Sequence, residues 1–268
     1  MQKKQPRNSL NDLMQIRQNG KYSSTNLIRG SMINEMFVIF SEYLNNNDKK
    51  YLMNRVMADN IIHKNSFYTR ENVWRIFDQR YLSCPSWIVQ NIASSTSHGV
   101  NSPDFLSLVY LYYAFRERMA FDIVTELVWD NWKNKRTPLD SGAVQEYIIS
   151  RENDVPAIKQ WSETTVRKCA QSVLASLRDF GVLKGNVNKS IQRPSVALET
   201  AHHLLCILMA EGYEGKAVIT AKDWRLFLWN EVDVIDALNR MAMKQWIRFE
   251  RSGPTTILEL VRLPGERL

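Results

Sequence analysis

The stretch that decides the fold is SETTVRKCAQSVLASLRDFGVLKGNVNKSIQR, residues 162–193. It opens on Ser162, a residue type that caps helix N-termini. Gly181 ends the helical pattern, and the Gly-Asn-Val-Asn sequence at 185–188 marks a turn between two short strand-like runs. The stretch therefore predicts a long helix over 163–180, followed by a short β-hairpin.

The predicted long helix has an apolar face and a polar face. The apolar side chains recur at i, i+3, i+4 and i+7 spacing, which is typical of a helix packed on a core. They are Val166, Cys169, Ala170, Val173, Leu174, Leu177 and Phe180. The opposite side, near the N-terminus, carries Thr164, Arg167, Lys168 and Gln171. Side chains of these types read base edges and hold phosphates, so we expect them to approach DNA.

Two shorter helices are predicted before the long one, over 141–149 and 156–161, and the hairpin after it carries Lys184, Lys189 and Arg193. This order is that of a winged helix-turn-helix, which we assign to 137–196. In that motif the long helix enters the major groove, and we expect the three basic hairpin residues to contact phosphates. Winged helices also dock proteins, so protein docking stays open as an alternative.

Residues 197–268 repeat the pattern more weakly. An apolar helix over 197–210 precedes a helix over 232–243 and two strands that flank a Ser-Gly-Pro turn at 252–254. The outer face of the second long helix offers carboxylates that would repel phosphate, namely Glu231, Asp233 and Asp236. We assign this second winged-helix-like element to packing or partner contacts. Its hairpin could still reach a DNA backbone through Arg248, Arg251 and Arg262.

The first half is expected to be an all-α bundle over 25–136, preceded by a basic N-terminal arm over 1–24. Residues 105–132 are the most apolar segment and predict one buried helix, or two with a break near 116–118. The charged connector 133–138 ends in proline and marks a domain boundary. A helix that begins near Thr69 is expected to show a further basic patch on its outer face, made of Arg70, Arg75 and Arg80.

The composition favours an acidic partner and a reducing compartment. The chain has 268 residues and 44% hydrophobic residues; 35 Lys and Arg against 28 Asp and Glu give a net charge of +7. Such a basic balance favours nucleic acid or an anionic surface. Three cysteines without metal-ligand spacing indicate reduced thiols and a cytoplasmic protein. No apolar run approaches the roughly 20 residues of a membrane span, so we expect a soluble chain without a membrane partner.

Motifs of enzymes are missing from the sequence. It contains no GxxxxGK[ST], GxGxxG, GxSxG or HExxH pattern. The adjacent His202 and His203 stand on an apolar helix without a carboxylate or cysteine at ligand spacing, so a structural role is expected for them. We therefore expect no catalysis, no cofactor, no metal and no small-molecule substrate.

Two stretches resemble the BrxA family, the small component of BREX bacteriophage-exclusion systems. One is YLMNRVMADNIIHKNSFYTRENVWRIFDQRYL at 51–82. The other is LVYLYYAFRERMAFDIVTELVW at 108–129, together with WSETTVRKCAQSVLASLRDFGVL at 161–183. The resemblance implies a helical domain similar to the NusB antitermination fold and winged-helix elements. It also implies sequence-tolerant DNA binding in phage defence, beside a methyltransferase and an ATPase.

Residues and resemblance together predict a non-enzymatic protein that binds double-stranded DNA with low sequence specificity, with other BREX proteins as further partners. An adaptor that assembles a larger defence complex through its winged helices is the first alternative. A transcriptional regulator is another, and it would need a preferred operator. RNA binding follows only from the NusB analogy.

Overall fold

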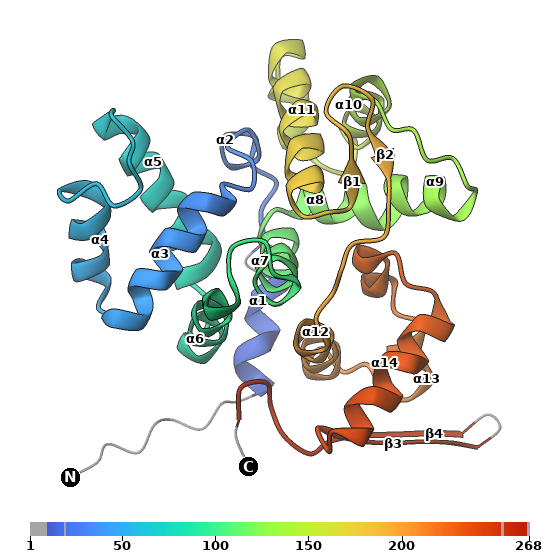
Figure 1. Cartoon of the computed structure of the whole chain (residues 1–268). Helices are drawn as coiled ribbons and strands as arrows, with labels where there is room; N and C mark the ends of the chain where they lie inside the picture. The colour runs from blue at the N-terminus through green and yellow to red at the C-terminus, as the bar shows by residue number, and fades with distance from the viewer. Residues whose placement is uncertain (1–9, 19, 253–254, 267–268) are drawn as a thin grey trace, which may run out of the picture.

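The computed structural model describes residues 10–18, 20–252 and 255–266, which are mainly helical with two small antiparallel hairpins (Figure 1). The expected predominance of helices is therefore confirmed, while the likeness of the first half to the NusB fold stays a prediction. The α-helices are α1 Met14–Gln18, α2 Ser24–Leu27, α3 Ile33–Asn45, α4 Lys49–Met57, α5 Phe67–Phe77, α6 Ser86–Ser95, α7 Pro103–Arg116, α8 Arg118–Asp122, α9 Trp129–Lys133, α10 Ser141–Ser150, α11 Glu163–Asp179, α12 Leu198–Ala210, α13 Lys216–Ile219 and α14 Glu231–Met243. Short 3-10 or π-helical turns are η1 Leu10–Leu13, η2 Asp78–Leu82, η3 Thr96–His98, η4 Ile123–Val128, η5 Pro156–Gln160 and η6 Lys222–Phe227.

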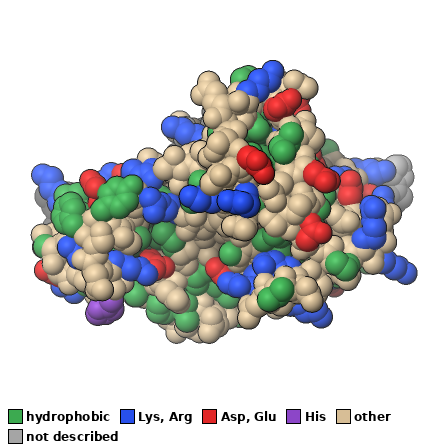
Figure 2. Space-filling view, turned by 90° about the horizontal axis from the view of Figure 1, so that it is seen from above, with side chains coloured by type: hydrophobic (Ala, Val, Ile, Leu, Met, Phe, Trp, Pro, Cys, Tyr) green, Lys and Arg blue, Asp and Glu red, His purple; other side chains and the backbone are tan. Residues whose placement is uncertain are grey.

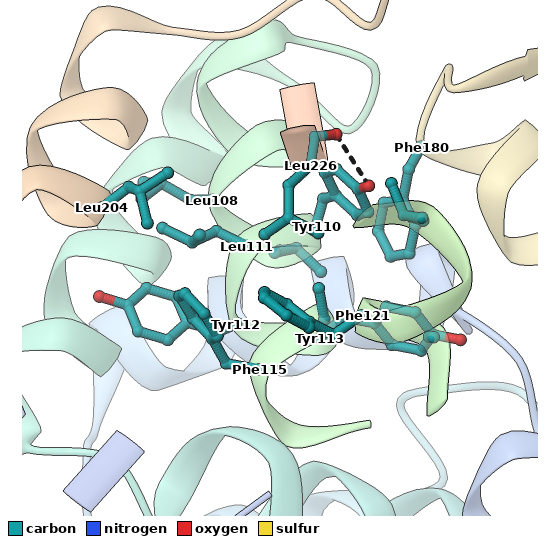
Figure 3. Close-up of a cluster of buried hydrophobic side chains, with 14 of the residues drawn as sticks. Leu108, Tyr110, Leu111, Tyr112, Tyr113, Phe115, Phe121, Phe180, Leu204 and Leu226 are labelled. Atoms are coloured by element: carbon teal, nitrogen blue, oxygen red, sulfur yellow. Dashed lines mark hydrogen bonds between the residues drawn. The ribbon is translucent and has the colours of Figure 1, made fainter. Parts of the chain in front are cut away.

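Helix α7 lies at the centre, between the group formed by α3 to α6 and the helices of the second half (Figure 1). Phe180, at the end of α11, packs on Tyr110 and Tyr113 with ring centroids 5.1 Å apart in both pairs. Tyr110 also donates a hydrogen bond to the carbonyl oxygen of Leu226 in η6 (3.0 Å; Figure 3). These contacts join residues on both sides of the expected boundary at 133–138, so the two halves share one hydrophobic core.

From residue 10 onward the N-terminal segment belongs to the fold and is not an arm. Leu13 and Ile16 are buried, η1 packs on α12, and α1 packs on α7. Gly20 passes so close to the end of α7 that a Cβ there would lie 2.3 Å from the carbonyl oxygen of Phe115. The arm expected over 1–24 is thus wrong for its later part, because apolar side chains at i, i+3 spacing fix it to the core. The basic residues at 3, 4 and 7 lie outside the described residues.

The apolar segment 105–132 forms two helical stretches. Glu117 ends α7 with φ −105° and ψ 80°, and α8 begins at the next residue. At this break Lys21 pairs with Glu117 through the backbone, since Lys21 N donates to Arg116 O (3.2 Å) and Arg118 N donates to Lys21 O (3.2 Å). Of the two alternatives left by the sequence, the broken helix is correct.

Both predicted hairpins are present. β1 (Leu183–Lys184) pairs with β2 (Ser190–Ile191), and β3 (Ile247–Ser252) pairs with β4 (Thr255–Leu260). Residues 137–139 run beside β2 as an additional extended segment, because Ile191 N donates to the carbonyl oxygen of Thr137 (2.7 Å). The first hairpin is therefore braced by the chain that leads into α10.

Candidate nucleic-acid interface

The elements expected around the long helix are present in the expected order. Asp140 caps α10, accepting a hydrogen bond from Ala143 N (2.8 Å), one residue before the predicted capping residue. Ser162 caps α11 as predicted, accepting from Thr165 N (3.2 Å). Helices α10 and α11 pack against each other, and β1 packs on α11. The sequence 141–191 thus folds locally into helix, short helix, long helix and hairpin.

Helix α11 has the two faces that its sequence indicates. The seven apolar side chains expected to face inward are all buried. The four polar residues expected to face outward are all exposed: Thr164, Arg167, Lys168 and Gln171. Among the described residues, none of these four side chains makes a hydrogen bond or an ion pair. They are consequently free to bind a ligand.

A second side of α11 is covered by α2 and the turn that follows it. Ser172 Oγ donates to the carbonyl oxygen of Ile28 (3.0 Å). A Cβ on Gly30 would lie 3.3 Å from Ser172 Oγ. The Cys169 thiol is buried under α2, and burial raises its pKa to about 12. The open surface of α11 is therefore the face of its N-terminal half that carries Thr164, Arg167, Lys168 and Gln171.

The β1–β2 hairpin brings two lysines near this surface. Lys184 is exposed and, within the described part of the chain, unpaired. Lys189 is half-buried, and its Nζ donates to the carbonyl oxygen of Asn186 (2.7 Å). Arg178, which the sequence interpretation missed, lies at the last turn of α11 and donates to Asn186 Oδ1 (3.3 Å), but its charge is paired with Asp179 (3.0 Å). A basic residue in the last turn, just before the hairpin, was the signal that could have found it.

Arg193 does not belong to this set of free cations, contrary to expectation. Its guanidinium donates to both carboxylate oxygens of Asp233 in α14, at 2.8 and 2.9 Å. Asp233 also accepts from Asn230 N (2.9 Å) as part of a capping box. The charge of Arg193 is thus neutralised within the protein, and the pair joins the chain that follows β2 to α14.

The patch expected from Arg70, Arg75 and Arg80 is only partly correct. Arg80 is buried, with 1% of its side chain exposed, and its Nε donates to Glu117 Oε1 (2.7 Å). It lies in the π-helical turn η2, which changes the angular step between residues and turns the side chain inward. Arg70 and Arg75 are half-buried and donate to carbonyl or amide oxygens, so their charge is not cancelled by a carboxylate among the described residues.

The end of the molecule that carries the start of α11 and the tip of the first hairpin faces the viewer in Figure 2. Lys and Arg side chains lie across the middle of this face, with acidic side chains among them.

Against known proteins, the family model BrxA matches residues 20–206. The chain belongs to the BrxA family. Membership implies a component of a BREX phage-defence system.

The comparison with solved structures bears only on the fold of the chain. A crystal structure of an uncharacterized protein from Magnetospirillum magneticum is similar, with a TM-score of 0.59 and 13% identity; the match covers 78% of this chain and 99% of that one. No curated protein matches the BrxA-family chain.

Residues 197–268 of this BrxA-family chain carry both paired and unpaired charges. Glu231 and Asp236 are exposed on α14, as expected. Arg248 on β3 pairs with Glu250 (2.9 Å) and Glu259 (3.6 Å). Arg262 donates to the carbonyl oxygen of Lys244 (2.6 Å), whereas Arg251 is exposed and has no partner among the described residues. The assignment of this element to packing or partner contacts therefore stays a prediction.

Residues that could support other chemistry are buried or scattered. Burial lowers the pKa of His202 to about 4 and that of His203 to about 3. Asn91 Nδ2 donates to Pro264 O and to His203 Nε2, so His203 Nδ1 is left to donate to Tyr112 Oη (2.6 Å). The described residues contain no group of His, Cys, Asp or Glu that could hold a metal ion. Within the same part of the chain, no helix has the length and apolar character to cross a bilayer.

Proposed function

We propose that this BrxA-family chain is a non-enzymatic DNA-binding component of a BREX system. It holds double-stranded DNA with low sequence specificity, using residues 137–196 as a winged helix-turn-helix. The observation that carries the proposal is the unpaired state of Arg167 and Lys168 on the exposed N-terminal half of α11. Cations without a carboxylate partner are the groups that neutralise phosphates and release counterions.

The orientation of the elements also supports duplex binding by residues 137–196. The first turns of α11 and the turn of the β1–β2 hairpin lie at the same end of the molecule (Figure 1). A duplex against α11 would therefore pass the hairpin as well, where Lys184 and Lys189 would contact its backbone. Thr164 and Gln171 are uncharged donors and acceptors that would reach base edges without strong preference. We expect this activity in the cytoplasm.

A titration of a labelled blunt duplex at near-physiological salt tests the proposal. The variant Arg167→Glu with Lys168→Glu should bind at least about tenfold more weakly, a loss of about 1.4 kcal/mol, because two cations that neutralise phosphates are replaced by carboxylates that repel them. Lys50→Glu with Lys216→Glu is the matched control, since it changes the net charge equally at exposed residues of α4 and α13. Unchanged affinity of a folded α11 variant would contradict the proposal.

An adaptor function is the second candidate, and exposed apolar side chains favour it. Val187 at the hairpin turn is 91% exposed, and Val232 and Met243 on α14 are also largely exposed. Such side chains become buried at protein interfaces. An adaptor would not retain duplex DNA at near-physiological salt and would co-purify with a larger subunit. A competition among unrelated duplexes and RNA would also reveal an operator preference or RNA binding, which the leading proposal does not expect.

A further inference from the structure

Two neighbouring aromatic side chains at the start of α5 are exposed to solvent. Phe67 is 59% exposed and Tyr68 is 63% exposed. Among the large hydrophobic side chains exposed in the described residues, they are the only aromatic rings. Exposing two adjacent rings forgoes the free energy that burial of large apolar groups contributes, which points to a ligand that covers them.

Each ring has an arginine beside it. The Cζ of Arg29 lies 5.9 Å from the ring centroid of Tyr68, and the Cζ of Arg70 lies 5.7 Å from that of Phe67. Neither guanidinium forms an ion pair with a carboxylate in the described part of the chain. Glu71 adds one exposed negative charge on the same helix. We call Phe67, Tyr68, Arg29 and Arg70 the aromatic platform.

The aromatic platform is continuous with α11 through two consecutive residues. Ile28 accepts a hydrogen bond from Ser172 of α11, while the next residue, Arg29, reaches Tyr68. Figure 1 shows α2, which precedes this turn, between α5 and α11. A polymer bound on the open face of α11 would have to cross this turn to reach the platform.

We infer that the platform stacks the unpaired bases of a DNA single strand that leaves the duplex held by α11. Bases have flat faces that stack on aromatic rings, and their phosphates suit the flanking guanidinium groups. What favours a nucleic acid is that both guanidinium groups lack a carboxylate partner among the described residues and so offer positive charge to phosphates. Phe, Tyr and Arg also suit protein interfaces, so a protein partner is one of the outcomes that the test separates. The inference rests on the proposed function and names its substrate class: duplex DNA with an adjoining single-stranded segment.

The test compares the affinity of the full chain for a blunt duplex, for the same duplex with a single-stranded DNA extension, and for the single strand alone. Wild type should prefer the extended duplex by about fivefold to a hundredfold, since stacking contributes about 1–3 kcal/mol per base. Phe67→Ala with Tyr68→Ala should abolish this preference and leave the blunt-duplex affinity unchanged. The matched control is Leu44→Ala with Met53→Ala, which truncates two exposed apolar side chains of α3 and α4. This variant should keep the preference for the extended duplex.

A fluorescent base analogue at the first unpaired positions gives a second readout. Its emission should be quenched by wild type and by Tyr68→Trp, and not by the double alanine variant. If wild type binds blunt and extended duplexes equally well, or if the alanine variant keeps the preference, the inference fails while the proposed function stands. Loss of a co-purifying protein from the alanine variant, with DNA preference unchanged, would also overturn it. If wild type binds no duplex, the proposed function itself fails.

Discussion

Replacing Arg80 by methionine would leave a carboxylate buried without its counter-charge. Arg80 and Glu117 are each only 1% exposed, and their Nε and Oε1 atoms are 2.7 Å apart. The remaining guanidinium nitrogens donate to the carbonyl oxygens of Gly30 (2.7 Å) and Asn26 (3.0 Å). One side chain therefore holds the start of α8 and the turn that packs against α11.

Breaking a buried ion pair by removing one partner costs about 3–5 kcal/mol, because the other charge stays desolvated. We expect a loss of that size for Arg80→Met, which keeps most of the side-chain volume. Burial raises the pKa of Glu117, and the Arg80 guanidinium opposes that rise. Without Arg80 the carboxyl is protonated more readily in the folded state. The difference in stability between variant and wild type should consequently shrink as the pH is lowered.

Urea unfolding followed by tryptophan fluorescence gives the measurement, and the chain has 8 tryptophans to report on it. Glu117→Gln in the Arg80→Met background should restore part of the lost stability, because a neutral amide is less costly to bury than a carboxylate. A loss below about 1 kcal/mol for Arg80→Met would refute the reasoning. The reasoning would also be refuted if the double variant lost as much free energy of unfolding as Arg80→Met and Glu117→Gln lose separately when added together.

Other buried or paired groups should also respond to substitution or pH. Gly20→Ala should lower the free energy of unfolding by about 1–3 kcal/mol in urea titrations, because its Cβ would collide with a backbone carbonyl. His202 and His203 stay neutral in the fold while the unfolded chain takes up protons below about pH 6.5, so stability should fall by roughly 4 kcal/mol from pH 7 to 5. His203→Gln should remove about half of that dependence on pH. Asp233→Asn should free Arg193 and strengthen duplex binding, with a log–log salt slope steeper by about 0.9 in fluorescence titrations.

Local sequence patterns were sufficient for most helix and strand positions. The predicted helix after Ser162 and the observed α11 agree to within one residue, because its cap, apolar spacing and terminal glycine are all local signals. The exposed positions of Arg167 and Lys168 follow from the same periodicity. A helix of regular geometry places such residues opposite its buried face whatever the rest of the chain does.

Partners distant in sequence could not be predicted from those patterns. Arg193 and Asp233 were both noticed as charged residues, but nothing local indicates that they neutralise each other across 40 positions. Arg80 was misplaced because the π-helical turn changes the helix phase and because its partner, Glu117, is 37 residues away. The exposure of Phe67 and Tyr68 was equally hidden, since the other aromatic residues of the same helix, Trp74 and Phe77, are buried.

The central claim is that DNA lies on the open half of α11. A photo-crosslinking amino acid placed at Gln171, on that open half, tests it directly with a labelled blunt duplex. The same amino acid at Lys216 on α13 serves as the control position. We predict a salt-sensitive protein–DNA crosslink from position 171 and none from position 216. A crosslink from 216 without one from 171, by a folded protein that retains the duplex, would contradict the account.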